Sequence, residues 1–162
     1  MTPDRIVLEL ARLEAAHLAG LVVQFDELLE ESGDTAGDDP AVQRLVPDAY
    51  EDAEAAQEFR DVTERDLLGR RRADAARVLA TLSGVGALSD DLQDPAFVEQ
   101  VEILLDRDDV QAWLRTLAAI RLVLATRLGI ADEDDHDQDD PRFGIYDWLG
   151  FRLDGLVRAL YD

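Results

Sequence analysis

Residues 109–128 read DVQAWLRTLAAIRLVLATRL and form the strongest pattern in the chain. Apolar side chains recur through this stretch at helical spacing and cover more than half of the helix circumference. They are Val110, Trp113, Leu114, Leu117, Ile120, Leu122, Leu124 and Leu128. A helix of this length is about 30 Å long, and one so apolar must lie inside the molecule with other elements packed around it. The stretch therefore predicts a central core helix.

Both ends of this helix carry residues that commonly begin and end helices. Asp108 and Asp109 can accept hydrogen bonds from the free N–H groups of the first turn, so they are expected to provide the N-cap. Gly129 can adopt the left-handed conformation that stops the last turn. Three arginines interrupt the apolar run, so the stretch is too polar for a membrane span.

The segments around the core helix predict a mainly α domain. Short apolar runs at 5–10 and 101–105 predict two strands that could pair with each other. The predicted helices run from the first strand to about Glu31, from Pro40 to Pro47, from Asp52 to Leu82, over 109–128, and from about Ile145 to Tyr161. We therefore expect one domain over 1–162, a compact bundle of about five helices around the central helix, with at most a small two-stranded sheet.

The last helix has apolar side chains on more than one face. Its expected core-facing stripe consists of Ile145, Trp148, Leu149, Leu153, Leu156 and Leu160. Phe151 and Tyr161 extend the apolar surface further, and Gly150 and Gly155 would let a second helix approach closely. Apolar residues left over after one face is buried usually mark a contact surface, so the sequence predicts a homodimer.

The composition limits the classes of function. The net charge is −21 in 162 residues, no Cys is present, and every basic residue is Arg. The absence of Cys excludes disulfides, thiolate metal sites and cysteine nucleophiles. The negative charge opposes nucleic-acid binding, because a duplex-binding face needs clustered positive charge. The first residues carry no signal-peptide pattern, so we expect a cytoplasmic protein with no membrane contact.

The acidic tract at 132–140 lies within a segment, 131–141, that is predicted to be a mobile loop. Aspartates at every second position over 135–139 match the first three ligand positions of a calcium loop. The turn glycine is replaced by Asp140, and the bidentate glutamate by Tyr146. A solvated charge run is the better interpretation, and divalent-cation binding is left open.

Arg70, Arg71 and Arg72 form the only basic cluster in the chain. On a helix, Asp66 lies one turn before Arg70 and Asp74 one turn after it, so ion pairs within the helix should absorb part of this charge. The three arginines are a candidate interaction patch, for an anion or for a partner.

Arg121 lies within an otherwise apolar segment of the core helix. A guanidinium there must reach solvent or pair with a carboxylate. Asp147, beside Trp148, is the candidate partner. The pair would then be a structural clamp between the core helix and the last helix.

No motif in the chain indicates catalysis. His17 and His136 lie outside any metal-ligand spacing, and there is no phosphate loop, nucleophile elbow or paired-cysteine motif. We therefore expect no enzyme activity, no cofactor and no metal.

Three segments carry a family resemblance: RLVPDAYEDAEAAQEFRDVTERDL at 44–67, AWLRTLAAIRLVLATRLGI at 112–130 and IYDWLGFRLDGLVRAL at 145–160. In this order they resemble an actinobacterial family defined as a domain of unknown function. Some of its members are described as oxidative-stress transcriptional regulators. The resemblance implies a regulatory role, and the absence of Cys argues against thiol sensing as its mechanism.

Three classes of function follow. The first is a non-enzymatic regulatory or adaptor protein that acts through protein contacts in transcription or stress response. Its partner is expected to have a basic surface, with no direct DNA binding by the chain itself. The second is an acidic nucleic-acid mimic that occupies a basic partner surface. The third is an enzyme with an unrecognised carboxylate site.

Overall fold

The computed structural model describes residues 5–31, 40–45, 53–83, 95–130, 140 and 143–161, without the side chains of Gln43, 53–65, Ala96 and Phe97. The described elements are β1 (Arg5–Ala11), α1 (Arg12–Glu31), α2 (Pro40–Gln43), α3 (Ala53–Leu82), a 3-10 turn (Pro95–Val98), β2 (Gln100–Asp106), α4 (Arg107–Leu128) and α5 (Gly144–Tyr161). The prediction of a mainly α fold with a small two-stranded sheet is confirmed.

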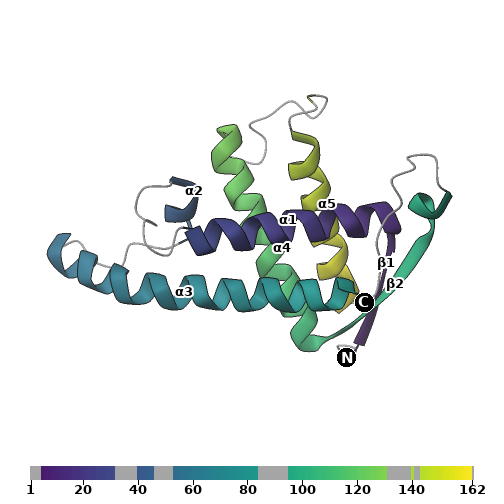
Figure 1. Ribbon diagram of the computed structural model, residues 1–162, viewed down its shortest axis with the longest axis horizontal. Coiled ribbons are helices and arrows are strands. Elements are labelled where there is room, and N and C mark those ends of the chain that lie inside the picture. The colour runs from purple at the N-terminus through teal and green to yellow at the C-terminus, as the bar shows by residue number, and fades with distance from the viewer. Residues whose placement is uncertain are drawn as a thin grey trace.

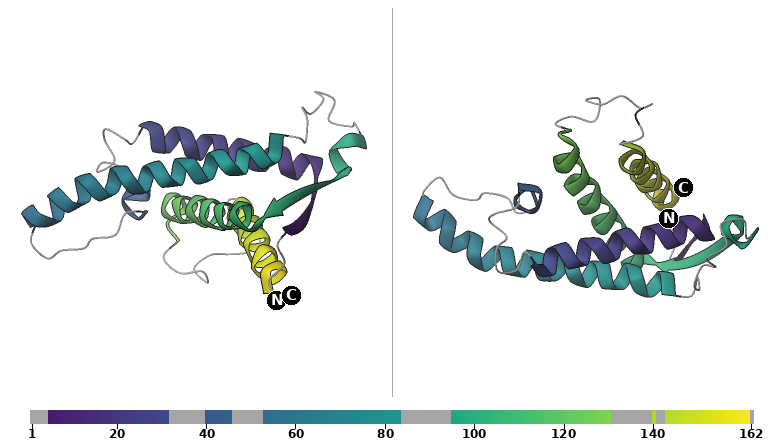
Figure 2. Two further views of the ribbon diagram at one scale, coloured as in Figure 1. Left: turned by 90° about the horizontal axis from the view of Figure 1, so that it is seen from below. Right: turned by 45° about the horizontal axis from the view of Figure 1, so that its top comes forward.

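The predicted core helix is α4, which contacts the other four α-helices and both strands. Figure 1 shows α1 and α3 running side by side, with α4 and α5 crossing them. Figure 2 shows the same arrangement as two layers. Trp113 and Leu117 of α4 are almost completely buried between these layers. Apolar burial is the main favourable contribution to folding, and here it is centred on the stretch with the strongest helical pattern.

Helix α4 begins earlier than its sequence pattern predicts. The N-cap is Asp106, whose carboxylate accepts from the Asp109 N–H at 2.8 Å. The Asp109 carboxylate accepts in turn from the Asp106 N–H at 3.0 Å, which completes a capping box. The prediction of Asp108 or Asp109 as the cap was therefore wrong, because β2 passes directly into α4. Gly129 ends the helix with φ of 75°, as predicted.

The two strands pair in antiparallel orientation, with Arg5 opposite Asp106 and Ala11 opposite Gln100. Successive side chains of a strand point to opposite faces. Ile103 and Leu105 of β2 are buried in the core, whereas Leu104 between them is exposed. The sheet therefore covers one end of the helical layers with a single apolar face.

Two other predictions need correction. The short helix α2 ends at Gln43 rather than at Pro47, because the Leu45 N–H donates to the Val42 carbonyl at 3.0 Å and tightens the chain into a turn. Ile145 was expected to face the core but is 50% exposed at the start of α5. None of the helices described here is long and apolar enough to cross a membrane.

Candidate functional site

Two surface hollows lie one after the other along α1. One hollow of about 590 Å³ lies between the first half of α1 and the start of α5. A second, of about 350 Å³, lies between the last half of α1 and α4. Leu21 and Gln24 line both hollows. We call the two together the α1 groove, which extends along α1 from Glu14 to Glu31.

The walls of the α1 groove are mainly apolar. Leu21, Ile145 and Trp148 line the first hollow, and Phe25, Ile120 and Val123 line the second. Gly20 lies on the wall of the first hollow, and a Cβ added there would meet no atom within 4 Å. A side chain at this position would therefore project into open space within the groove.

Glu14 holds the two walls of the first hollow together. Its carboxylate accepts from Trp148 Nε1 at 3.0 Å and from Arg152 Nε at 3.1 Å, and Arg152 Nη2 also donates to it. Burial would raise the pKa of Glu14, but the hydrogen bonds from Arg152 and Trp148 outweigh it and lower the pKa below its usual value. The carboxylate is therefore kept ionised and fixed in position, and α1 is tied to α5.

An exposed aromatic side chain lies beside this anchor. Phe151 of α5 is 68% exposed, and the Arg152 guanidinium carbon is 5.5 Å from its ring centroid. This is within the range of a cation–π contact. Arg152 is also bonded to Glu14, so one guanidinium group contacts both the Glu14 carboxylate and the Phe151 ring. Phe151 and Ile145 are both exposed apolar side chains of α5, and Ile145 lines the first hollow.

The charged residues that line the α1 groove are mostly acidic. They are Glu14, Glu27 and Glu31 against Arg127, so the described lining has a net charge of −2. This sign agrees with the net charge of −21 for the whole chain. An occupant of the groove would therefore need apolar and basic groups.

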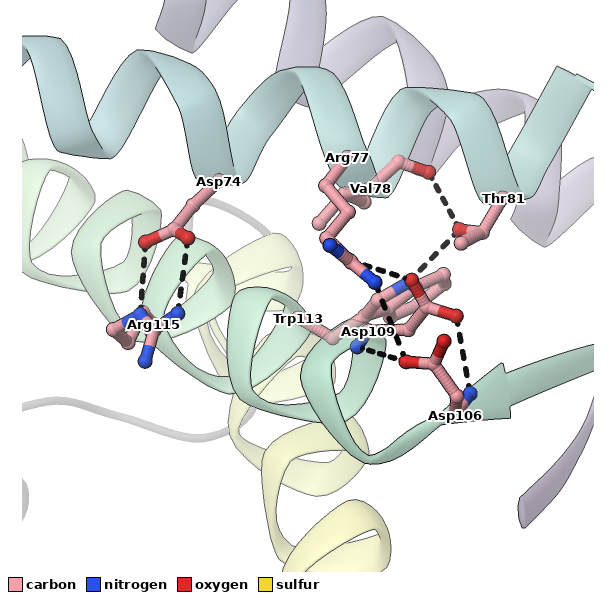
Figure 3. A network of polar contacts seen from close by, with 8 residues as sticks. All are labelled: Asp74, Arg77, Val78, Thr81, Asp106, Asp109, Trp113 and Arg115. Carbon is pink, nitrogen blue, oxygen red and sulfur yellow. Dashed lines mark hydrogen bonds and ion pairs between the residues drawn. The ribbon is translucent and has the colours of Figure 1, made fainter. Parts of the chain in front are cut away.

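A separate network of polar contacts joins α3 to α4 (Figure 3). Arg77 donates from Nε to Asp109 at 2.7 Å and from Nη2 to Asp106 at 3.4 Å. Arg115 forms two hydrogen bonds with Asp74, at 2.8 and 3.0 Å. These contacts pair an arginine of each helix with carboxylates, including the two of the N-cap, and hold α3 against α4. These residues therefore have a structural role.

The three arginines of the predicted patch, Arg70, Arg71 and Arg72, differ in their burial and in their hydrogen-bond partners. Arg70 pairs with Asp66 at 3.2 Å, as predicted, with both side chains largely exposed. Arg72 reaches α1, where it pairs with Asp26 at 3.0 Å, and this hydrogen bond raises the pKa of Arg72. Arg71 is partly buried, and its Nε has no hydrogen-bond partner among the residues that the structure describes.

Arg121 joins α4 to α5 through Tyr146. Its Nε donates to the Tyr146 carbonyl at 3.2 Å, and its guanidinium lies 4.0 Å from the centroid of the Tyr146 ring. It also packs on Gly150, where an added Cβ would be 2.9 Å from Nη2. Gly150 therefore accommodates an arginine of the same chain, whereas the space around Gly155 is open, and the approach of a second helix stays a prediction. The ion pair of Arg121 with Asp147 stays a prediction.

Of the two histidines and the acidic tract at 132–140, the structure describes only His17 and Asp140. His17 is exposed and lines the first hollow of the α1 groove. His136 and the tract at 132–139 lie outside the described residues. Within the described part of the chain, no group of three or more histidines and carboxylates could hold a metal ion.

Comparison with known proteins places the chain in a family. A family model described as "Domain of unknown function (DUF2017)" matches residues 1–160. The chain belongs to the DUF2017 family. No curated protein and no solved structure matches it.

The α1 groove of this DUF2017 chain was not predicted from the sequence. Glu14 and Arg152 are 138 positions apart, so no local pattern could pair them. One signal was present, namely the apolar side chains on more than one face of the last helix. Two of these side chains, Ile145 and Trp148, line the hollow against α1, and the homodimer stays a prediction.

Proposed function

We propose that this chain is a non-enzymatic adaptor or regulatory protein that binds an amphipathic, basic helix of a partner protein in the α1 groove. The single observation that carries the proposal is that Leu21 and Gln24 line both hollows, which lie one after the other along α1. Glu14 to Glu31 spans about 25 Å of α1 at 1.5 Å per residue. That length accommodates four to five turns of a partner helix, the usual arrangement when a helix lies in an apolar groove.

The distribution of charge supports a basic partner. Three glutamates and one arginine line the groove, in a molecule with a net charge of −21. Complementary charge accelerates encounter with a partner and disfavours partners of the same sign. Apolar anchors on one face of the partner helix would bind Leu21, Trp148 and Ile145, and basic residues at its edges would meet the acidic rim.

The environment of Glu14 supports a non-enzymatic role for the groove. Among the described residues that line the first hollow, it is the only carboxylate, and three N–H groups already donate to it. A general base must accept a proton from a substrate near neutral pH. All three donors bond to Oε2, and a carboxylate with a lowered pKa that is held in this way is poorly suited to that task.

The proposed setting is a cytoplasmic, actinobacterial one, in transcription or in the response to oxidative stress, as the family resemblance implies. Regulation there would act through the partner, because the chain has no Cys for a thiol switch. We expect no specific DNA binding by the isolated protein. Of the three clustered arginines, Arg70 and Arg72 are already paired with carboxylates of the chain.

The test is affinity capture from a lysate of the source organism, followed by calorimetric titration of each captured protein in pure form. Gly20→Arg would place a long cationic side chain in open space within the first hollow, without touching the core. Gly69→Arg is the matched control, because Gly69 is also exposed, lies in a helix and has open space around its Cβ. Both variants change the net charge equally.

We expect a partner whose affinity falls at least about tenfold with Gly20→Arg, equivalent to about 1.4 kcal/mol, and is unchanged with Gly69→Arg. A partner that binds all three proteins equally would show that the groove is not the docking site. If Gly20→Arg instead converts a dimer into a monomer in analytical ultracentrifugation, the occupant is a second copy of this chain and the proposal is wrong.

A further inference from the structure

A second hollow, away from the α1 groove, lies between α3 and α4 and has a volume of about 640 Å³. That is within the range of small-molecule sites in proteins. Arg70, Arg71 and Arg115 line it, together with Asp74, and we call it the arginine hollow. Its remaining walls are apolar and include Leu67 and Leu122.

The described lining of the arginine hollow is positive in a strongly negative molecule. Three arginines against one aspartate give a net charge of +2, whereas the whole chain carries −21. The aspartate is already engaged, because both oxygens of Asp74 accept from Arg115, at 2.8 and 3.0 Å. It is therefore not a full counter-ion for Arg71.

Arg71 is the unusual residue of this hollow. Its Nε is buried, and no acceptor of the described chain bonds to it. Burial lowers the pKa of Arg71, and the charge of Asp74 offsets this only in part. A buried charged donor without an acceptor destabilises a fold unless a partner is supplied. Nothing in the α3–α4 network explains why an arginine stands at this position.

We propose that the arginine hollow binds a small organic phosphate monoester, with its phosphate on Arg71 and its body against the apolar wall. The phosphate would also bind Arg70, in place of the exposed pair of Arg70 with Asp66. A phosphate monoester carries between about −1.5 and −2 charges at neutral pH, which matches the lining charge of +2. A single carboxylate would leave half of that charge uncompensated. The planar guanidinium group also suits phosphate oxygens geometrically.

The experiment is calorimetric titration of the full chain with phenyl phosphate, with benzoate and inorganic sulfate as comparison anions. We expect phenyl phosphate to bind more tightly than either. Arg71→Met should weaken it by about tenfold or more, the loss expected for one hydrogen bond between charged groups. Arg158→Met is the matched control, since Arg158 lies on α5, is paired with Asp154 and is largely exposed.

Thermal unfolding separates a binding role from a structural one. If Arg71 serves a ligand, Arg71→Met should raise the Tm of the ligand-free chain, because it removes a half-buried charge that Asp74 compensates only in part. A lower Tm would show that Arg71 is structural and would overturn the proposal. Ala118→Glu provides a second test at an exposed position of the same hollow. Its carboxylate should compete with phenyl phosphate and abolish binding.

Three results would contradict the proposal. The first is no binding of phenyl phosphate at millimolar concentration. The second is equal binding by the wild type and by Arg71→Met. The third is sulfate binding as tight as that of phenyl phosphate, which would indicate a general anion effect rather than a site for an organic phosphate.

Discussion

The indole N–H of Trp113 donates to the hydroxyl of Thr81, with 2.9 Å between Nε1 and Oγ1. That hydroxyl donates in turn to the Val78 carbonyl at 2.6 Å. Figure 3 shows the two bonds in sequence, from α4 to α3. Trp113 is only 1% exposed, so its N–H has no alternative acceptor in solvent. Thr81 therefore supplies the hydrogen-bond acceptor that the buried indole N–H needs at the centre of the fold.

Replacing Thr81 with Val should lower the free energy of unfolding by about 1–3 kcal/mol, since it leaves the Trp113 N–H buried without an acceptor. Urea unfolding followed by circular dichroism measures this. Ser83→Ala is the control, because the Ser83 hydroxyl bonds only to the Ala80 carbonyl, at 2.7 Å, and is exposed. We expect that variant to change stability by no more than about 0.5 kcal/mol. Equal losses in both variants would contradict the role given to Thr81.

Glu14→Gln should destabilise the chain in a pH-dependent way. The folded pKa of Glu14 is lowered, so its contribution to stability is present above the unfolded pKa and is lost as the pH falls through the folded pKa. We expect a loss of about 1 kcal/mol at pH 7 that shrinks steadily towards pH 3. The measurement is urea unfolding across this pH range. Glu27→Gln, at an exposed position on the same helix, should show no such trend.

Glu102→Arg should stabilise the chain. The register places Glu9 directly opposite Glu102, and both side chains are exposed. Like charges in directly opposed positions of an antiparallel pair are unfavourable. Replacing one with arginine should raise the free energy of unfolding by about 0.5 kcal/mol, measured by chemical denaturation. Adding Glu9→Arg to this variant should remove the gain, and a gain that persists in the double variant would argue against a cross-strand effect.

Two glycines of α5 should respond differently to alanine. Gly155→Ala meets no neighbouring atom and should stabilise the chain by about 0.5–1 kcal/mol through helix propensity. Gly150→Ala would place a Cβ 2.9 Å from Arg121 Nη2 and displace that side chain from Tyr146. We expect no gain from it, or a loss, in thermal unfolding. In an Arg121→Met background the gain should return, and its absence there would exclude Arg121 as the cause.

The local part of the fold could be predicted from the sequence. Gly129 and the apolar spacing of α4 depend on neighbouring residues only, and both were predicted correctly. The cap at Asp106 was missed because it depends on where β2 ends, and helix periodicity carries no information about that. The partial burial of Arg71 was missed for a similar reason, because Arg70, Arg71 and Arg72 look alike in the sequence and only α1 and α4 distinguish them.

The candidate groove could not be predicted because it is made by contacts between distant segments. Trp148 lies 134 positions from Glu14, to which it donates. Its position on α5 suggested burial, and the structure confirms that only in part, since Trp148 is half-buried. The polar partner that holds it could be chosen only once α1 and α5 had been brought together. The abundance of carboxylates in this chain makes such a choice especially ambiguous from sequence alone.

The pairing of β1 with β2 has a consequence for the order of folding. The register joins residues about 90 to 100 positions apart, so α1, α2 and α3 all lie within the loop that this pairing closes. Closing so long a loop is entropically unfavourable until the intervening segments are compact. We therefore expect the helices to associate before the rate-limiting step and the sheet to form after it. Glu102→Arg should then slow unfolding while leaving the refolding rate nearly unchanged. The stability of the sheet would therefore set the unfolding rate, and with it the lifetime of the native state.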